Sequence, residues 1–424
     1  MNERRPVRAV ADQRTAATLR RQLVADLRHS GCLRSDRLAG ALGEVPRELF
    51  VEDIAAGQGL EAVYRDEALP AKTDAQGWWL SSSSQPSIMA LMLEQLDVAP
   101  GQRVLEIGAG TGYNAALLRQ LVGPDGQVTT IDIDPELAAR ARRALRQGGY
   151  PARVVVGDGR DGVPDAAPYD RVIVTASVEE IPNAWLDQLA PGGRLQFPLR
   201  LDSEAVPQVI PVLERRDGHA ESVAMTWGGF MALHGGDGGR RGPSSALHAS
   251  EWSAGEQRPL VRITGPAPAG LSGAARRRLL ALVLEGPQSH EPKGRLVTHW
   301  PAPPNLLLHL VLHVPAARRI ELHTPGRQAV GLMSADGRDV AVVSVPVCGV
   351  THDSRLEARR HPRRDAWSID TFGDGELAGE LDDLVDEWRA HIRSGRTQLQ
   401  IEARPSSAGS YAELRFGWEP RRRD

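Results

Sequence analysis

The alternation of apolar and polar residues predicts a first half built from alternating strands and helices. Short runs rich in valine, isoleucine and threonine are typical of buried strands, and the stretches between them carry apolar residues at helical spacing. The first predicted strand begins at Val104, and four more cover residues 128–131, 152–156, 170–175 and 193–197. Helices are predicted at 113–121, 135–147 and 181–189. This order predicts an α/β fold, with a mostly parallel, doubly wound sheet that binds ligands at the carboxyl ends of its strands.

Further elements are predicted on both sides of this core. Apolar spacing predicts helices at 15–27 and 35–42, which would form an N-terminal helical cap. Residues 81–84 are four serines, and we interpret them as an exposed loop before a helix at 87–96. Strands at 206–213 and 222–230 look antiparallel and would close the domain.

A glycine-rich stretch at 235–243 predicts a linker, and after it the pattern changes. We therefore predict a first domain at 1–234, a linker at 235–246 and an accessory α+β domain at 247–424. The predicted elements of the second domain are strands at 305–313 and 339–345, a hairpin strand and turn at 326–338, a helix at 376–392 and an edge strand at 397–403. His309, His313 and His323 lie in this domain, and we interpret them as structural residues, not metal ligands.

The loop after the first predicted strand carries the clearest chemistry. Gly108, Gly110 and Gly112 follow one another at every second position. Glycine lets a ligand approach the backbone closely, and the first turn of the following helix would face that ligand. A dinucleotide site spaces its glycines as G-x-G-x-x-G, so a dehydrogenase is disfavoured. The spacing G-x-G-x-G is the form found in S-adenosylmethionine enzymes.

Two acids extend this site along the strand ends. Asp132 follows the second strand, where it can accept hydrogen bonds from ribose hydroxyls, and Asp158 follows the third, where it can accept one from the adenine amino group. The predicted cofactor-binding residues are Ser84, Glu106, Gly108, Gly110, Gly112, Asp132, Asp158 and Gly159.

Composition narrows the class of protein. The 424 residues carry a formal net charge of -3, so the charge gives no indication that the protein binds nucleic acid or an anionic membrane. The two cysteines, Cys32 and Cys348, indicate neither a disulfide framework nor a metal site. No signal peptide and no membrane-spanning run is evident, so we expect a cytoplasmic protein. We also expect that it needs no metal.

Several motifs in the first half resemble the protein L-isoaspartyl O-methyltransferases. They occur in the family's order and spacing from about Arg20 to His234, together with the glycine loop. The matching segments are Val45-Pro-Arg-Glu-Leu-Phe-Val51, Tyr64-x-Asp66, Ser84-Gln-Pro86, Val156-Gly-Asp-Gly159, Pro168-Tyr-Asp170, Val174-Thr-Ala176 and Leu189-Ala-Pro-Gly-Gly193. The resemblance implies a class I methyltransferase fold and S-adenosylmethionine as the methyl donor.

The resemblance also implies an acceptor site. The serine that opens the Ser-x-Pro turn lies against the substrate carboxylate in that family, and here it is Ser84, the predicted catalytic residue. Ser83, Gln85 and Thr175 are the predicted substrate-binding residues, whereas Asp66 is expected to organise the loop. The family usually has Thr-Ile where this chain has Ser82-Ser83, and its repair enzymes tend to end near Gly235.

The extra domain looks like that of homologues that tailor lanthipeptides, including the group named for the FxLD system. Such enzymes methylate an aspartate of a ribosomally made precursor peptide, and the ester passes through a succinimide to isoaspartate. The alternatives are repair of damaged proteins and an inactive binding protein with this fold. On the tailoring hypothesis, truncation near Gly236 is expected to leave cofactor binding largely intact, provided the first domain stays folded, and to remove methylation of the cyclised peptide.

Overall fold

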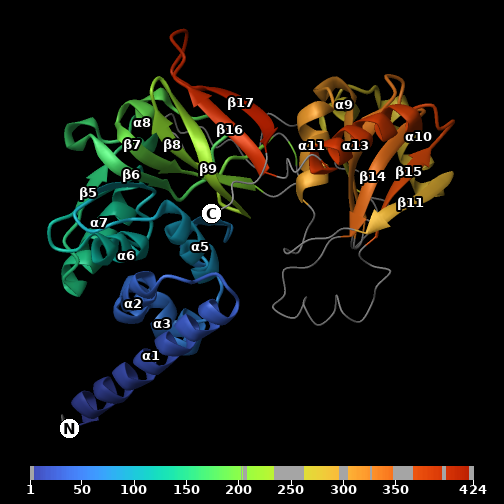
Figure 1. Ribbon diagram of the computed structural model, residues 1–424. Helices are drawn as coiled ribbons and strands as arrows, with labels where there is room; N and C mark the ends of the chain where they lie inside the picture. Colours follow the sequence, from blue (N-terminus) through green and yellow to red (C-terminus); the bar gives the residue numbers. More distant parts are fainter. Residues whose placement is uncertain are drawn as a thin grey trace. The chain divides into compact units, whose positions relative to one another are not determined.

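The computed structural model describes residues 4–201, 203, 208–233, 262–295, 304–324, 327–346, 366–393 and 398–419 (Figure 1). The chain divides into two compact units. The first contains residues up to 200, residues 208–240 and residues 400–415, and the second contains residues 201–207, 241–399 and 416–424. The predicted linker at 235–246 and Cys348 lie outside the described residues, whereas Cys32 is a free thiol.

A nine-stranded sheet forms the centre of the first unit, in the order β17-β16-β9-β8-β7-β6-β3-β4-β5. Its parallel strands are β3 (Arg103–Ile107), β4 (Gln127–Asp132), β5 (Arg153–Val156), β6 (Tyr169–Val174) and β7 (Leu189–Gln196). The chain moves outward from β3 to β5 and then returns to the other side of β3 for β6 and β7. The predicted doubly wound sheet is confirmed, and its switch point lies between β3 and β6.

The predicted antiparallel pair is also present. Strands β8 (Gln208–Arg216) and β9 (His219–Gly228) follow β7 in antiparallel pairing. The helices of this unit's core are α5 (Pro86–Leu96), α6 (Tyr113–Val122), α7 (Pro135–Gly148) and α8 (Asn183–Asp187), with short 3-10 turns η2 (Gly159–Asp161) and η3 (Pro164–Ala166). Helix α8 is shorter than the predicted helix 181–189 because Pro182 is extended and Leu189 already begins β7.

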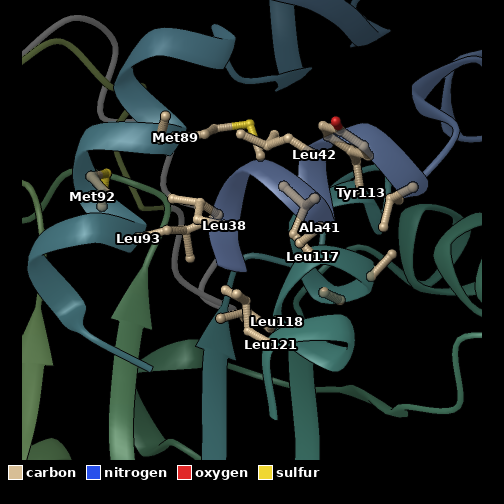
Figure 2. Close-up of a cluster of buried hydrophobic side chains, with 14 of the residues drawn as sticks. Leu38, Ala41, Leu42, Met89, Met92, Leu93, Tyr113, Leu117, Leu118 and Leu121 are labelled. Atoms are coloured by element: carbon tan, nitrogen blue, oxygen red, sulfur yellow. The ribbon is translucent and has the colours of Figure 1, made fainter. Parts of the chain in front are cut away.

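The predicted N-terminal cap is confirmed. It consists of α1 (Arg4–His29), α2 (Asp36–Glu44), η1 (Arg47–Phe50), α3 (Glu52–Gln58) and α4 (Leu60–Val63). Figure 2 shows Leu38 and Leu42 of α2 among Met89 of α5 and Tyr113 and Leu117 of α6, all of them buried. The cap is therefore packed onto the helix that begins at the glycine loop.

The C-terminal strands return to the first unit's sheet. Strand β16 (Gln398–Arg404) pairs with β9 through Glu402 and Ala403, and β17 (Glu413–Glu419) lies beyond it. The strand predicted at 397–403 is confirmed, but its prediction as an edge strand is wrong because β17 covers it. The second unit also differs from the predicted domain 247–424, since residues 400–415 belong to the first unit.

The second unit contains a six-stranded antiparallel sheet and helices, so the predicted α+β class is confirmed. The sheet order is β10-β12-β13-β14-β15-β11. The strands are β10 (Arg262–Thr264), β11 (Ser289–Arg295), β12 (Arg319–Thr324), β13 (Arg327–Met333), β14 (Val340–Pro346) and β15 (Ala366–Phe372). The helical segments are α9 (Pro266–Ala269), α10 (Gly273–Glu285), α11 (Pro304–His313), η4 (Ala316–Arg318) and α13 (Ala378–Arg393).

One predicted strand of this unit is wrong: residues 305–313 form helix α11. Leu306, Leu307, Leu308, Leu310 and Val311 are all buried, so the run has no polar face to reveal a helical period. Its two histidines stack with ring centroids 4.0 Å apart. Among the described residues no group of histidines, cysteines or acids is arranged to hold a metal ion.

Candidate functional site

The glycine loop joins β3 to α6 at the switch point of the sheet. Gly108, Gly110 and Gly112 have φ angles of 96°, 50° and 88°, which favour glycine. A methyl group on Gly108 would lie 2.5 Å from Oγ1 of Thr175, and one on Gly112 would lie 3.1 Å from Ala141. Gly112 also caps α6 without a side chain, so the helix N-terminus presents its backbone amides directly.

Asp132, predicted to bind ribose, ends β4 beside this loop. Its carboxylate accepts hydrogen bonds from the backbone N–H of Gly110 at 2.8 Å and of Asp134 at 3.0 Å. Burial raises the pKa of Asp132, and these backbone donors lower it in part. The structure therefore places Asp132 in contact with the glycine loop, and its role as the ribose acceptor stays a prediction.

Glu106 lies beneath the loop and is 1% exposed. Its carboxylate accepts hydrogen bonds from Oγ1 of Thr130 at 2.6 Å and Nδ2 of Asn114 at 2.8 Å. These bonds link β3, β4 and α6, so Glu106 supports the loop from inside. Burial is the main cause that raises its pKa to about 7.

This raised pKa predicts a pH-dependent stability. In the unfolded chain Glu106 loses its proton near pH 4.5, whereas in the folded protein it keeps the proton until about pH 7. The folded state therefore binds more protons in this range, and the free energy of unfolding falls as the pH rises from 4.5 toward 7. The difference between 4.5 and about 7 corresponds to about 3 kcal/mol. In denaturant titrations, Glu106→Gln should lose less stability between pH 5 and 8 than the wild type. An unchanged slope would assign the dependence to another group.

Asp158, predicted to bind adenine, caps η2 after β5. Its carboxylate accepts the Arg160 backbone N–H at 2.9 Å and pairs with the Arg160 guanidinium at 2.6 Å. The neighbouring Gly159 packs tightly, because a methyl group there would lie 2.5 Å from Cγ2 of Ile107. Nε1 of Trp185 donates to the Gly159 carbonyl at 2.8 Å. The end of β5 is thus fixed from two sides.

The serine run differs from its prediction as an exposed loop. Ser81–Ser83 end strand β2 (Trp79–Ser83), which pairs with β1 (Leu69–Thr73) in a two-stranded hairpin. Ser81 and Ser83 are buried, whereas Ser82 and Ser84 are half-buried. The alternation of a strand explains this pattern, because successive side chains point to opposite faces.

The serine segment lies against the glycine loop. A methyl group on Gly110 would be 3.6 Å from the Ser82 carbonyl oxygen and 3.7 Å from Oγ of Ser81. The segment that carries the predicted acceptor residues therefore meets the loop that carries the predicted cofactor residues. These two segments are far apart in the sequence, and their contact is the central feature of the site.

Asp66 and Thr175 hold neighbouring loops in place. Asp66 accepts hydrogen bonds from the Ser87 backbone at 2.8 Å and from Nε2 of Gln85 at 3.2 Å. The prediction that Asp66 organises this loop is confirmed, and the Gln85 side chain is engaged by it. Oγ1 of Thr175 donates to the Gly108 carbonyl at 2.9 Å, so Thr175 also contacts the glycine loop.

Arg47 is a residue of this site that the sequence analysis did not single out. Its side chain is 0% exposed. The guanidinium donates to the carbonyl groups of Val63 at 2.9 Å and of Glu67 and Ser84 at 3.1 Å each. It thereby fixes Ser84 to the cap. The only signal for it was its place in the Val-Pro-Arg motif.

Burial lowers the pKa of the Arg47 guanidinium, and nearby Tyr113 and Asp66 raise it in part. The Arg47 guanidinium thus lies next to the backbone of the serine segment, where it donates to the Ser84 carbonyl.

The arrangement fits an S-adenosyl ligand. Side chains at Gly108 or Gly112 would collide with Thr175 or Ala141, so only glycine allows the loop to hold this conformation with its backbone exposed to a ligand. A free helix N-terminus and carboxylates at two strand ends supply donors for a carboxylate group and acceptors for hydroxyl and amino groups.

The first half of the chain is similar to known proteins. A model of the family described as protein-L-isoaspartate(D-aspartate) O-methyltransferase matches residues 18–235. The chain is 41% identical to the protein-L-isoaspartate O-methyltransferase of Hyperthermus butylicus over 225 residues, which are 51% of this chain and 88% of that protein. It is 42% identical to that of Methanopyrus kandleri over 191 residues, 44% of this chain and 80% of that protein.

A solved structure of the same name, protein-L-isoaspartate O-methyltransferase, is similar over a longer range. It covers 93% of this chain and 99% of its own, with a TM-score of 0.50 and 24% identity. At this identity the likeness shows the fold alone. It nevertheless extends well beyond the residues that the family model matches.

Proposed function

Since the chain belongs to the protein-L-isoaspartate(D-aspartate) O-methyltransferase family, we propose that it esterifies an aspartate-derived carboxylate within a polypeptide. Membership makes it an S-adenosylmethionine-dependent carboxyl methyltransferase. The observation that carries the proposal is the contact between the serine segment and the glycine loop at Gly110. It brings the segment that carries the predicted acceptor residue Ser84 next to the predicted cofactor loop.

Methyl transfer to a carboxylate needs few functional groups from the residues that bind the acceptor. When bound, S-adenosylmethionine supplies an electrophilic methyl group, whose bond to sulfur breaks as a carboxylate oxygen attacks the carbon. A side-chain carboxylate is ionised near neutral pH, so no general base is needed. Positioning and exclusion of water then provide most of the rate enhancement. A site made of hydroxyls and backbone amides is suited to this task.

Ser84 is the proposed acceptor contact. Its carbonyl is held by Arg47, and the residues that follow it are held by Asp66. The hydroxyl is thereby carried on a fixed backbone, where it can donate to one carboxylate oxygen and leave the other to attack. The ester that results is open to attack by the next backbone nitrogen. A succinimide then forms, the amide proton is lost and methoxide leaves as methanol.

Ser83 gives a specific test of the acceptor segment. Its side chain is 3% exposed, and its Oγ has no hydrogen-bond partner among the described residues. Burying such a hydroxyl costs about 1–3 kcal/mol, so Ser83→Ala should raise the free energy of unfolding. If the hydroxyl contacts the substrate, the same variant should lower kcat/KM for the peptide. Unchanged stability and unchanged kcat/KM would together remove Ser83 from the site.

Two substrate classes fit the proposal. The first is isoaspartyl residues in damaged proteins, and the similarity to family members of that name over most of their length favours it.

The second class is a ribosomally made precursor peptide, such as a cyclised lanthipeptide. Trp78 and Trp79 favour this class, because they are 74% and 46% exposed at the start of the strand that carries the serines. Exposed tryptophans are common anchors for a partner's side chains. A defined peptide could use them, whereas repair requires tolerance of many sequences.

Competition between substrates separates the two classes. Full-length protein with S-adenosylmethionine would receive unrelated isoaspartyl peptides and a cyclised precursor that contains aspartate, in one reaction followed by mass spectrometry. Repair predicts methylation of every isoaspartyl peptide at similar kcat/KM. Tailoring predicts methylation of one aspartate in the precursor and poor use of the others. The inactive binding protein would methylate neither.

A further inference from the structure

The loop between β16 and β17 reaches the first unit's strand ends. We call residues 405–412 the return loop. The Asn183 backbone N–H donates to the Ser410 carbonyl at 2.8 Å, and its side chain donates to the carbonyls of Ser406 at 2.9 Å and Gly409 at 2.8 Å. The Ala412 N–H donates to Ile181 at 2.8 Å. These bonds fasten the loop to the segment before α8.

Tyr411 connects this loop to the predicted adenine acid. Its backbone pairs with Pro182, and the hydroxyl of its half-buried side chain lies near the Arg160 guanidinium and interacts with it. Arg160 in turn contacts both carboxylate oxygens of Asp158, with Nε at 3.1 Å from each and Nη2 at 2.6 Å from one. A chain of side-chain contacts therefore runs from the C-terminal hairpin to the end of β5.

The contact between Arg160 and Tyr411 matters because the ion pair between Arg160 and Asp158 alone is weakly constrained. The Arg160 side chain is 37% exposed, and partly exposed pairs of this kind contribute little and fix geometry poorly. A second contact on the guanidinium restricts its orientation. Because Arg160 occupies one edge of the carboxylate, it also determines which lone pairs of Asp158 remain for a ligand.

We propose that the return loop is part of the cofactor site, with Tyr411 acting through Arg160 to hold Asp158 in the orientation that accepts the adenine amino group. Tyr411 and Arg160 are positioning residues in this scheme. The inference rests on the proposed function, in which S-adenosylmethionine is the donor and Asp158 contacts its adenine.

A chain truncated before the return loop would lack part of the proposed cofactor site. Truncation near Gly236 removes β16, β17 and the return loop together with the second unit. It also exposes β9, whose Ser222 side chain donates to Gln400 at 2.9 Å. The expectation that such a truncation leaves cofactor binding intact is therefore withdrawn.

Tyr411→Phe in the full-length protein tests the proposal. Calorimetry would compare S-adenosylhomocysteine with S-inosylhomocysteine, in which a carbonyl group replaces the adenine amino group. The wild type should prefer the adenine ligand. In the variant, affinity for that ligand should fall roughly tenfold, the scale of one well-placed hydrogen bond, while affinity for the inosine ligand stays the same.

Tyr64→Phe is the matched control, because it removes a hydroxyl that contacts Arg20 in the N-terminal cap. It should keep the wild-type preference between the two ligands. Wild-type preference in Tyr411→Phe would overturn the proposal, as would an equal loss of both ligands with a lower Tm. A wild type that binds both ligands equally would instead remove Asp158 from the adenine site, and one that binds neither would contradict the proposed function.

Discussion

Gly110→Val is expected to abolish S-adenosylmethionine binding. Gly110 has a φ of 50°, which disfavours a β-branched residue, and its amide donates to Asp132. A methyl group there already reaches ordinary contact with Ser81 and Ser82, so the larger valine side chain would separate the two segments that form the site. Calorimetry with S-adenosylhomocysteine should show no measurable binding.

Gly123→Val is the matched control. Gly123 has a φ of 66° at the end of α6, and nothing lies within 4 Å of a methyl group placed there. Both glycines have a positive φ angle, and only Gly110→Val crowds the site. We expect Gly123→Val to lower the Tm and to keep wild-type affinity. Equal affinity in Gly110→Val and wild type would show that the cofactor lies elsewhere.

Ser84→Ala is expected to reduce kcat by roughly two orders of magnitude, which is what a misplaced acceptor can cost. The backbone at Ser84 is held by Arg47, so loss of the hydroxyl should leave the segment in place. Affinity for S-adenosylhomocysteine should therefore stay within a few-fold of wild type. Rapid-mixing measurements of methyl transfer in a single turnover would report the chemical step directly.

Ser81→Ala offers the comparison within the same segment. Ser81 is buried in β2 on the same face as Ser83, whereas Ser84 follows the strand. We expect a much smaller loss of turnover there. Full activity in Ser84→Ala would transfer the acceptor role to another hydroxyl or to the backbone.

Local patterns were sufficient to predict the parallel sheet and the glycine loop. A strand, a turn with glycine at alternate positions and a helix are specified by neighbouring residues, as in Val104 to Tyr113. Asp132 and Asp158 were likewise selected because each lies at the end of a predicted strand. Parallel strand ends meet at one edge of the sheet, so their sequence positions imply proximity.

Contacts between distant segments were not predictable in this way. Arg47 is polar by type, yet it is buried because carbonyl groups of residues 63–67 and of Ser84 accept its hydrogen bonds. The pairing of β16 with β9 joins residues about 180 positions apart, and nothing in residues 398–404 marks which sheet they enter. Helix α11 was mistaken for a strand because burial on all sides removes the period that distinguishes the two.

The central claim is methyl transfer to an aspartate-derived carboxylate, and one labelling experiment tests it most directly. The full-length protein would receive S-adenosylmethionine with a labelled methyl group and an isoaspartyl peptide, with the aspartyl isomer in a parallel reaction. We expect one methyl group per isoaspartyl residue, released as methanol by mild base, and no label in the unconstrained aspartyl peptide. Label that resists base, or no label in either this peptide or a cyclised precursor, would contradict the account.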